Sequence, residues 1–198
     1  MTACSGLEME APALTEETAE LETLLAEMPW VSESVSSETS NDKVVYQFSF
    51  RTCPPCIQFK KEAWPILEEV GIETRLVMTA RRRKSTEDER TAVVELARSR
   101  DWDMAEAWMR SNSPNGYYKK MTFPVTDGNA PREAELEKLR GQIDLLDDIL
   151  AVNGIEMAYP TVLWQDAENV WRAEIGYYSD MAQDIITSMG VNEGISYK

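Results

Sequence analysis

The segment Cys53-Pro54-Pro55-Cys56 constrains the fold of this chain more than any other part of the sequence. It follows residues 43–50, where β-branched and aromatic side chains predict a strand. A helix with a kink at Pro65 is predicted over residues 54–70, and a second strand over residues 72–79. This order predicts a parallel crossover, which belongs to the α/β class of folds. The two cysteines therefore stand where a strand passes into the first turn of a helix.

A cysteine pair at this spacing has three known uses: a zinc site, a structural disulfide or a redox centre. A zinc site needs four ligands, but the chain has one further cysteine, Cys4, and no histidine. The lack of histidine also excludes Ser-His-Asp and Cys-His nucleophile systems. A Cys53–Cys56 disulfide would close a loop too short to add much stability. A helix N-terminus stabilises a thiolate, so the context favours a redox pair, with Cys56 the less exposed of the two.

The residues around the pair influence its reactivity. Pro54 and Pro55 have no N–H groups, so two of the donors that could point at the Cys53 sulfur are missing. Arg51 either compensates in part through its positive charge or is a solvent-exposed charge without that role. We expect the pKa of the Cys53 thiol to be lowered but not extreme, and the reduction potential not to be strongly oxidising.

Charge and hydropathy limit the partners of the chain. The net charge is −15 at pH 7, so the phosphate backbone of a nucleic acid would be repelled. No stretch approaches the ~20 apolar residues of a membrane-spanning helix, and no hydrophobic signal segment follows Met1. We expect either a cytosolic protein or a periplasmic one whose signal segment has been removed. The small residues before Cys4 resemble the end of a lipoprotein signal, so we expect membrane attachment only if Cys4 is lipidated. The alternative is an ordinary cysteine in a loose terminus.

The sequence divides into four predicted parts, namely residues 1–28, 29–80, 81–154 and 155–198. The first is a loose N-terminus, to about residue 14, followed by a short helix that Thr15 caps. The second contains the cysteine pair. The third is a helical insertion, in which Thr86 and Glu89 form a capping-box pattern and Pro131 suits the first turn of a long helix. The fourth is a strand hairpin followed by a helix.

The insertion begins with a basic run, Arg81-Arg82-Arg83-Lys84, directly after the second predicted strand. In open α/β sheets, ligands bind at the carboxyl ends of the strands. The run is therefore placed to dock a partner or to favour the Cys53 thiolate. The alternative is a solvated stretch of charge, which is the more frequent use of such a run.

Two motifs together resemble the thioredoxin-fold proteins. Residues 44–56 resemble the active-site strand and helix start of that family, and Tyr159-Pro160-Thr161-Val162-Leu163 resembles its cis-proline loop and the following strand. Over about residues 30–190, the chain is similar to the catalytic domains of the periplasmic disulfide isomerases DsbC and DsbG and to the TrbB-type proteins of conjugative plasmids. The resemblance implies a central mixed sheet flanked by helices, with a helical insertion between the active-site βαβ unit and the cis-proline hairpin.

The resemblance also implies roles for individual residues. Cys53 would be the attacking thiolate and Cys56 the resolving thiol. The bond before Pro160 would be cis, and the backbone of Tyr159 would pair with a substrate strand; the alternative is a trans proline at the start of a strand. No cofactor and no metal is implied. The supporting residues of the site would be Pro160, Tyr159, Pro54, Pro55 and Arg51.

The chain departs from the family in two respects. Gln47 stands six residues before the first cysteine, where thioredoxin has a buried acid, and this argues against a dedicated thioredoxin-like reductase. DsbC and DsbG carry an N-terminal dimerisation domain, whereas a short helix alone precedes the fold here. This difference argues against efficient isomerisation in a cleft between two catalytic domains.

The leading hypothesis is thiol–disulfide exchange on secreted or envelope proteins in the bacterial periplasm, through a mixed disulfide at Cys53 that Cys56 resolves. The partners would be proteins with cysteine residues and, by resemblance, a membrane reductant of the DsbD kind. The first alternative is an assembly factor or soft-metal carrier that uses the same cysteines without turnover. The second is a chaperone-like scaffold in which the helical insertion binds partners and both cysteines are dispensable. The direction of electron flow stays open.

Overall fold

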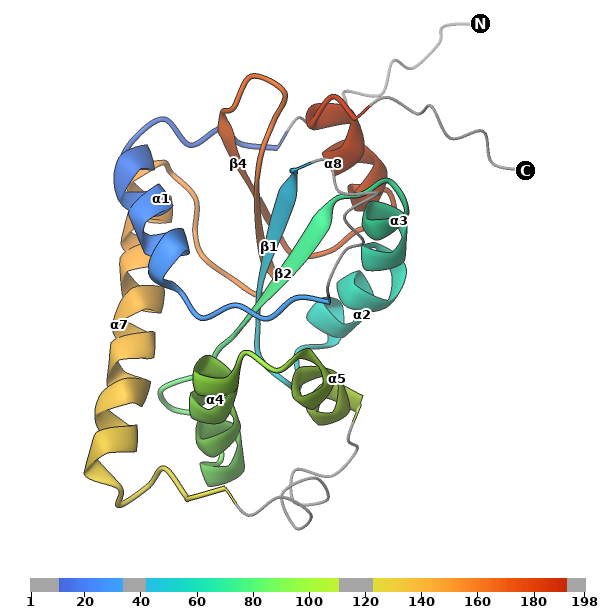
Figure 1. The fold of residues 1–198 in the computed structure, drawn as a ribbon. Coiled ribbons are helices and arrows are strands. Elements are labelled where there is room, and N and C mark those ends of the chain that lie inside the picture. Colours follow the sequence, from blue (N-terminus) through green and yellow to red (C-terminus); the bar gives the residue numbers. More distant parts are fainter. Residues whose placement is uncertain (1–10, 34–41, 111–122, 192–198) are drawn as a thin grey trace, which may run out of the picture.

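The strand before the cysteine pair is an inner strand of a four-stranded mixed sheet with the order β2-β1-β3-β4 (Figure 1). The computed structural model describes residues 11–33, 42–110 and 123–191. The strands are β1 (Val44–Ser49), β2 (Glu73–Met78), β3 (Thr161–Gln165) and β4 (Trp171–Ile175). β1 runs parallel to β2 and antiparallel to β3, and β3 runs antiparallel to β4. The predicted parallel crossover and C-terminal hairpin are therefore confirmed.

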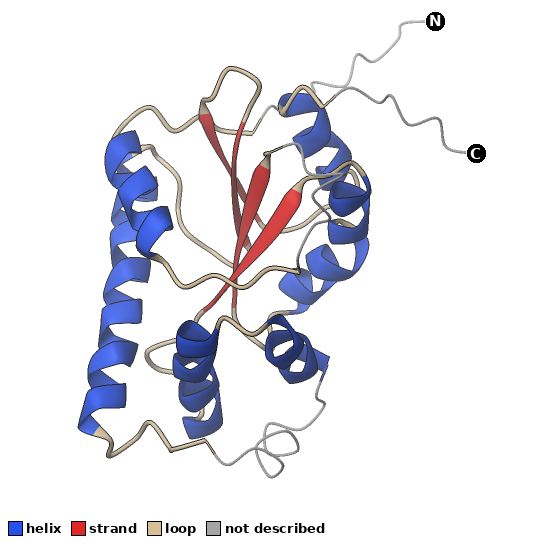
Figure 2. Ribbon diagram, in the orientation of Figure 1, coloured by secondary structure: helices blue, strands red, loops and turns tan. Residues whose placement is uncertain are grey.

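Helices cover both faces of the sheet and one of its ends (Figure 1, Figure 2). They are α1 (Thr18–Glu27), α2 (Pro54–Glu62), α3 (Trp64–Glu69), α4 (Glu87–Ser99), α5 (Trp102–Arg110), α7 (Ala130–Val152) and α8 (Met181–Ser188). α2, α3 and α8 lie on one face, and α1 and α7 lie on the other. α4 and α5 lie below the sheet in Figure 1. The α/β fold with a helical insertion between the crossover and the hairpin is confirmed.

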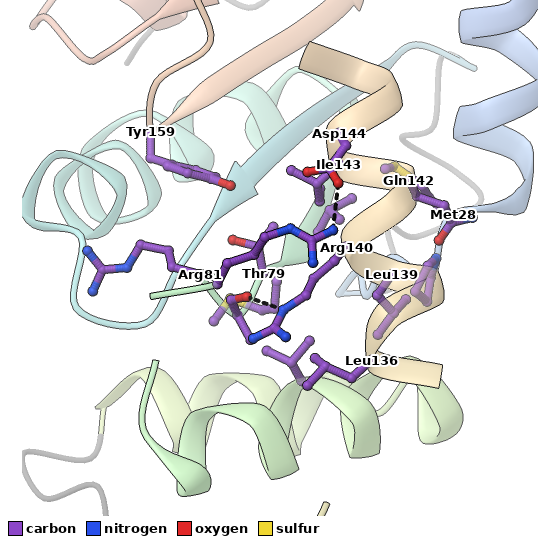
Figure 3. A pocket seen from close by; sticks show the side chains of 16 residues that line it. Met28, Thr79, Arg81, Leu136, Leu139, Arg140, Gln142, Ile143, Asp144 and Tyr159 are labelled. Atoms are coloured by element: carbon purple, nitrogen blue, oxygen red, sulfur yellow. Dashed lines mark hydrogen bonds and ion pairs between the residues drawn. The ribbon is translucent and has the colours of Figure 1, made fainter. Parts of the chain in front are cut away.

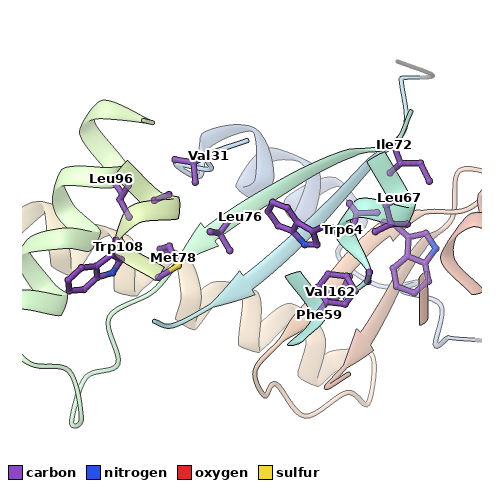
Figure 4. Packing of buried hydrophobic residues seen from close by; sticks show 14 of the residues in the cluster. Val31, Phe59, Trp64, Leu67, Ile72, Leu76, Met78, Leu96, Trp108 and Val162 are labelled. Atoms are coloured by element: carbon purple, nitrogen blue, oxygen red, sulfur yellow. The ribbon is translucent and has the colours of Figure 1, made fainter. Parts of the chain in front are cut away.

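Strand side chains alternate between two cores, as the period of a strand requires. On β1, Val45 faces the core under α2, α3 and α8, whereas Tyr46 and Phe48 face the core under α1 and α7. Figure 4 shows the first of these cores, which continues to Leu96 of α4 and Trp108 of α5. The insertion helices therefore share the apolar core of the sheet and are held against it by the same burial.

α2 begins at the cysteine pair, as predicted, but in place of one helix kinked at Pro65 the chain forms two helices, α2 and α3. Cys53 is the N-cap of α2, and Pro54 and Pro55 occupy its first two positions. Proline is tolerated there because the first N–H groups of a helix have no partner within the helix. At the other end, Ala63 stands between the two helices, since Pro65 has no N–H to continue the helical hydrogen bonds.

The starts of the insertion helices follow the sequence pattern. Thr86 Oγ1 accepts a hydrogen bond from the Glu89 N–H (3.2 Å), and the Glu89 carboxylate accepts one from the Thr86 N–H (2.8 Å). The predicted capping box of α4 is therefore confirmed. Pro131 lies in the first turn of α7, also as predicted, directly after the N-cap Asn129 and Ala130.

The start of α1 differs from the prediction. α1 begins at Thr18, and the residue before it, Glu17, has a left-handed backbone and makes no side-chain cap bond. Thr15 is not the cap. The N–H groups of Thr15 and Glu16 instead donate to Oδ1 of Asn153, which directly follows α7 (2.7 and 3.0 Å). A contact between distant segments has replaced the local cap that the sequence pattern predicted.

Residues 11–14 are not loose, in contrast to the prediction. The Leu14 N–H donates to the carbonyl of Trp171 in β4 (2.8 Å), and the Ala173 N–H donates to the carbonyl of Pro12 (3.1 Å). Leu14 is also buried in the core under α1 and α7. This segment is ordered because β4 offers backbone groups that need partners and the core offers an apolar site for Leu14.

A second short pairing lies at the opposite edge of the sheet, on β2. Val31 and Leu76 of β2 exchange two backbone hydrogen bonds, of 3.0 and 2.8 Å, in an isolated antiparallel bridge. Val31 is buried in the core that contains α2 and α3. The chain from residue 11 to residue 33 therefore contacts both outer strands of the sheet, first β4 and then β2.

Candidate active site

The cysteine pair lies at the N-terminus of α2, a few residues after β1. A disulfide bond joins Cys53 and Cys56. The Cys53 Sγ accepts a hydrogen bond from the Cys56 N–H at 3.3 Å. Because Pro54 and Pro55 have no N–H groups, Cys56 supplies the first N–H of the helix, and this N–H points at Cys53. The position and the donor both favour negative charge on the Cys53 sulfur once the disulfide is reduced.

Both cysteines are buried, and each is 1% exposed. The expectation that Cys56 would be less exposed than Cys53 is therefore wrong for the disulfide form. Another segment of the chain lies over Cys53, because its Sγ is 3.6 Å from the carbonyl oxygen of Tyr159.

The loop before β3 faces the cysteine pair, although 106 residues separate Cys53 from Tyr159. The Tyr159–Pro160 peptide bond is cis, as the resemblance implied. The loop is tied to the following hairpin, because the Gly176 N–H donates to the carbonyl of Pro160 at 2.8 Å. The two sequence motifs that suggested the site are therefore in contact.

An aromatic pair borders the site. The rings of Phe50 and Tyr159 meet edge to face, with 5.3 Å between their centroids. The guanidinium of Arg81 lies 3.8 Å from the centroid of the Phe50 ring. Burial raises the pKa of the Tyr159 phenol, so its hydroxyl stays neutral. Sequence reasoning missed Phe50, whose one signal was its place at the end of the segment that leads to the cysteines.

The basic run is divided between two settings. Arg81 faces the aromatic pair. Arg82 is half exposed and forms ion pairs with Glu137 and Asp144 of α7, at 2.8 and 2.6 Å. The last two residues of the run are exposed. The solvated interpretation therefore suits the end of the run, whereas Arg81 is the member that reaches the site.

Arg51 lies in a different setting from those expected. It is 7% exposed, so the interpretation as a solvent-exposed charge is wrong. Its Nε donates to the carbonyl of Trp108 in α5 at 3.1 Å, and its guanidinium lies 4.5 Å from the centroid of the Trp108 ring. Arg51 therefore ties the loop before the cysteines to the helical insertion, and these contacts hold its charge toward α5.

Gln47 lies on β1 beneath the first turn of α2. It is 1% exposed, and its Nε2 donates to the carbonyl of Cys56 at 2.9 Å. Its Oε1 is buried without a hydrogen-bond partner among the residues that the structure describes. Gln47 thus fixes this turn through a neutral amide, and it supplies no ionisable group at the position where thioredoxin has an acid.

Residues 11–33, 42–110 and 123–191 contain neither a cluster of metal ligands nor a membrane-spanning helix. Within these ranges, no group of three or more His, Cys, Asp or Glu side chains is arranged to hold a metal ion. None of the helices in these ranges combines the length and the apolar character needed to span a bilayer. Cys4, the expected site of lipidation, lies outside the described residues.

No protein-family model matches the sequence, and no curated protein matches it. Solved structures do resemble the fold. ScsC from Proteus mirabilis in a transitional conformation gives a TM-score of 0.61 at 14% identity, over 91% of this chain and 81% of that chain. The thiol-disulfide exchange protein alpha-DsbA2 from Wolbachia pipientis gives 0.55 at 11% identity, over 86% and 92%. A periplasmic thioredoxin-like protein from Salmonella enterica serovar Typhimurium gives 0.54 at 14% identity, over 84% and 95%.

These similarities identify the fold. The mixed sheet, the helices on its two faces and the inserted helices form a thioredoxin-like fold. The cysteine pair lies at the start of the helix that follows the first strand, and the cis-proline loop lies opposite it. This arrangement places the Cys53 sulfur next to the backbone of the cis-proline loop.

Proposed function

We propose that the chain catalyses thiol–disulfide exchange on proteins with cysteine residues. The observation that carries the proposal is the Cys53–Cys56 disulfide at the N-terminus of α2, with the Cys53 sulfur 3.6 Å from the Tyr159 carbonyl. A disulfide that closes so short a loop adds little stability, whereas a helix N-terminus favours a reactive thiolate. The thioredoxin-like fold and the exchange activity named for the Wolbachia protein support the proposal.

The disulfide form accepts two electrons from a substrate dithiol. A substrate thiolate attacks the Cys53 sulfur, the Cys53–Cys56 bond breaks, and Cys56 leaves as a thiolate. A second substrate thiolate then attacks the substrate sulfur of the mixed disulfide, and Cys53 leaves. The substrate has gained a disulfide, both cysteines of the protein are reduced, and the two thiol protons pass to them through solvent.

The reverse sequence reduces or rearranges a substrate disulfide. The Cys53 thiolate attacks one sulfur of the substrate disulfide, and the other substrate sulfur leaves as a thiolate. Cys56 then attacks the Cys53 sulfur, which releases the substrate as a dithiol and restores the Cys53–Cys56 bond. If a different substrate thiolate resolves the mixed disulfide instead, the substrate leaves with a rearranged disulfide.

The substrate needs a place to bind beside Cys53, and the loop before Pro160 offers one. We propose that an extended substrate segment pairs with the backbone of Tyr159, whose carbonyl oxygen is within reach of the Cys53 sulfur. The prolines at positions 54 and 55 keep the N-terminus of α2 free of N–H groups other than that of Cys56.

We also propose that the protein works in the bacterial envelope. The similarity of the sequence motifs to DsbC, DsbG and the TrbB-type proteins suggests a disulfide isomerase or oxidoreductase of the bacterial envelope. The description of the Salmonella protein as periplasmic supports this location. The substrates would then be secreted or envelope proteins, and a DsbD-like membrane reductant would keep the pair reduced for isomerisation. Lipidation at Cys4 would add a membrane anchor.

Cysteine substitutions test the exchange activity. We expect Cys53→Ser to abolish insulin reduction and the refolding of scrambled ribonuclease, because the attacking sulfur is gone. We expect Cys56→Ser to accumulate mixed disulfides with substrate, which non-reducing gels and mass spectrometry detect, because the resolving sulfur is gone. Cys4→Ser is the matched control and keeps the wild-type rate.

Full activity of Cys53→Ser would show that the proposal is wrong. Stoichiometric copper(I) binding by the wild type, without exchange, would instead favour the metal-carrier alternative. The direction of electron flow follows from the reduction potential of the pair: a value of about −120 mV indicates an oxidase, and one of about −270 mV indicates a reductant.

A further inference from the structure

A cavity of about 200 Å³ lies between the end of β2, α4 and α7. Its apolar wall is formed by Val77, Met78, Val93, Leu136, Leu139 and Ile143. An apolar cavity of about 150 Å³ is large enough to hold a benzene ring. The cavity therefore has room for the aromatic side chain of a second molecule.

The cavity and the cysteine pair share Tyr159. The Tyr159 side chain lines the cavity, and the carbonyl oxygen of the same residue lies 3.6 Å from the Cys53 sulfur. In Figure 3 the Tyr159 hydroxyl points toward the α7 side of the cavity, where Ile143 lies. A polypeptide held by a disulfide to Cys53 would advance about 3.3 Å per extended residue. It would therefore pass the cavity within a few residues of its cysteine.

A buried amide also lines the cavity. Gln142 of α7 is 9% exposed, and its Nε2 has no hydrogen-bond partner in the part of the chain that is described. Buried polar groups are normally paired, so this donor is left for an occupant that carries an acceptor. The phenol oxygen of a tyrosine meets this need, whereas a purely apolar side chain does not.

The rim of the cavity on the side of the cysteine pair is cationic. Arg81 lines the cavity, and its guanidinium lies over the ring of Phe50. In Figure 3 its side chain points away from α7. Within the described ranges, Arg81 pairs with no carboxylate, although the chain carries a net charge of −15. This cation is therefore available to a carboxylate of a second molecule.

We propose that the cavity binds a tyrosine side chain of the substrate polypeptide, and that Arg81 favours an acidic residue next to that tyrosine. The inference rests on the proposed exchange activity and specifies which residues a substrate carries near its reactive cysteine. The apolar wall takes the ring, Gln142 donates to the phenol oxygen, and Tyr159 links this position to Cys53. Substrates with a tyrosine–acid pair a few residues from the reactive cysteine react faster than substrates without it.

Symmetric peptide disulfides provide the test. Each peptide has one cysteine and a Tyr-Glu pair placed about two to four residues from it, and the reduced full-length protein is mixed with the peptide homodisulfide. The second-order rate constant is measured from the release of peptide thiol. Replacing the peptide tyrosine by serine lowers this constant about tenfold. Replacing the peptide glutamate by glutamine lowers it about two- to fivefold at low salt.

Two variants and two matched controls locate the effect. Ile143→Trp fills the cavity and abolishes the preference for the peptide tyrosine, whereas Val152→Trp, at an exposed position of the same helix, keeps it. Arg81→Gln abolishes the preference for the peptide glutamate, whereas Arg83→Gln, two residues away and exposed, keeps it. A thermal unfolding transition in each variant checks that it is folded. Comparison of Arg81→Gln with Arg83→Gln tests the inference independently of any repacking of side chains in the cavity.

The outcomes separate this inference from the proposed function. Equal rate constants for the tyrosine and serine peptides would overturn the inference and leave exchange activity in place. A tyrosine preference that survives in Ile143→Trp would place the binding site elsewhere and would also overturn it. Binding of a fatty acid in the cavity, with no preference among peptides, would assign the cavity to a lipid and overturn it. No exchange with any peptide would overturn the proposed function and this inference together.

Discussion

Two prolines decide which backbone donor reaches the Cys53 sulfur. A side chain at the N-cap of a helix usually accepts from the second or third N–H of that helix. In α2 these positions are Pro55 and Cys56, and the 3.3 Å hydrogen bond from Cys56 to the Cys53 Sγ is the one that remains. The thiolate that forms on reduction therefore has one close backbone donor from this helix, the N–H of Cys56. A residue other than proline at position 55 could have supplied a second.

Restoring the missing donor is expected to make the pair more oxidising. Pro55→Ala adds an N–H at the second position of α2, which stabilises the reduced thiolate form. One hydrogen bond worth about 1.4 kcal/mol raises the reduction potential by about 30 mV. Equilibration with glutathione buffers measures the change. Pro54→Ala is the control, because the first N–H of a helix does not face the cap side chain, and an equal shift in both variants would contradict the explanation.

The sequence predicts the places of some residues of the site but not the contacts of others. Cys53, Cys56 and Pro160 stand in short motifs whose chemistry is local, so their places could be predicted. The contact of Arg51 with Trp108 could not, because it depends on where an inserted helix packs, 57 residues away in the sequence. Gln47 could be recognised as a missing acid, but its hydrogen bond to Cys56 depends on the distance between β1 and α2.

Among the elements, the turn between β3 and β4 depends on one buried carboxylate. Asp166 is 2% exposed; its Oδ1 accepts from the N–H groups of Glu168 and Val170 (3.0 and 2.8 Å), and its Oδ2 accepts from the Nε of Arg172 (2.8 Å). Burial opposes its charge, but these hydrogen bonds outweigh the burial and hold the pKa of Asp166 below its usual value. The hairpin that carries Pro160 at its start is closed by this residue.

Asp166→Asn is expected to lower the free energy of unfolding by about 1–3 kcal/mol at pH 7, because an amide cannot match the charge of Arg172. The folded pKa lies below the unfolded value of about 3.9, so the carboxylate stabilises the fold above that pH. Its contribution is lost as the pH falls through the folded pKa. Urea unfolding at about pH 7 and pH 3 measures the difference between wild type and variant.

The difference in the free energy of unfolding between wild type and Asp166→Asn is expected to be largest at pH 7 and to shrink in acid. Glu168→Gln, an exposed change in the same turn, serves as the control and has little effect at either pH. A destabilisation by Asp166→Asn that stays constant into acid would show that the charge of Asp166 is not the cause.

Element boundaries were predictable where a cap is local and were missed where it is not. The capping box at Thr86 and Glu89 lies within four residues, and the structure has it as predicted. Thr15, followed by two glutamates, was also a local cap signal, but its N–H donates to the side chain of Asn153 and α1 starts later. Residues 11–14 have no strand pattern of their own, because their order comes from β4 and from the core.

Across the entire chain, negative charge is in large excess. The net charge of −15 at pH 7 makes the folded state repel itself more than an expanded chain does. Exposed ion pairs contribute little in the opposite direction. Added salt screens this repulsion, since the Debye length falls from about 30 Å at 0.01 M to about 8 Å at 0.15 M.

The melting temperature at pH 7 is therefore expected to rise with salt, by about 2–5 °C between low and about 0.5 M sodium chloride. Differential scanning calorimetry of the oxidised protein measures it. Near pH 4.5, close to the pI of the sequence, the net repulsion vanishes and the rise should vanish with it. A melting temperature that falls with salt at pH 7 would show that specific ion pairs, and not net charge, dominate the electrostatics of this fold.

The chain from residue 11 to residue 33 places a short backbone pairing on each outer strand, with Leu14 and its neighbours on β4 and Val31 on β2. An uncovered outer strand is a template on which another chain can add, and this is a common route to aggregation. One segment of the protein therefore covers part of each outer edge of the sheet and gives those parts protection from pairing with other copies. A shortened form designed for handling or crystallisation would keep this protection only if it starts no later than Ala11.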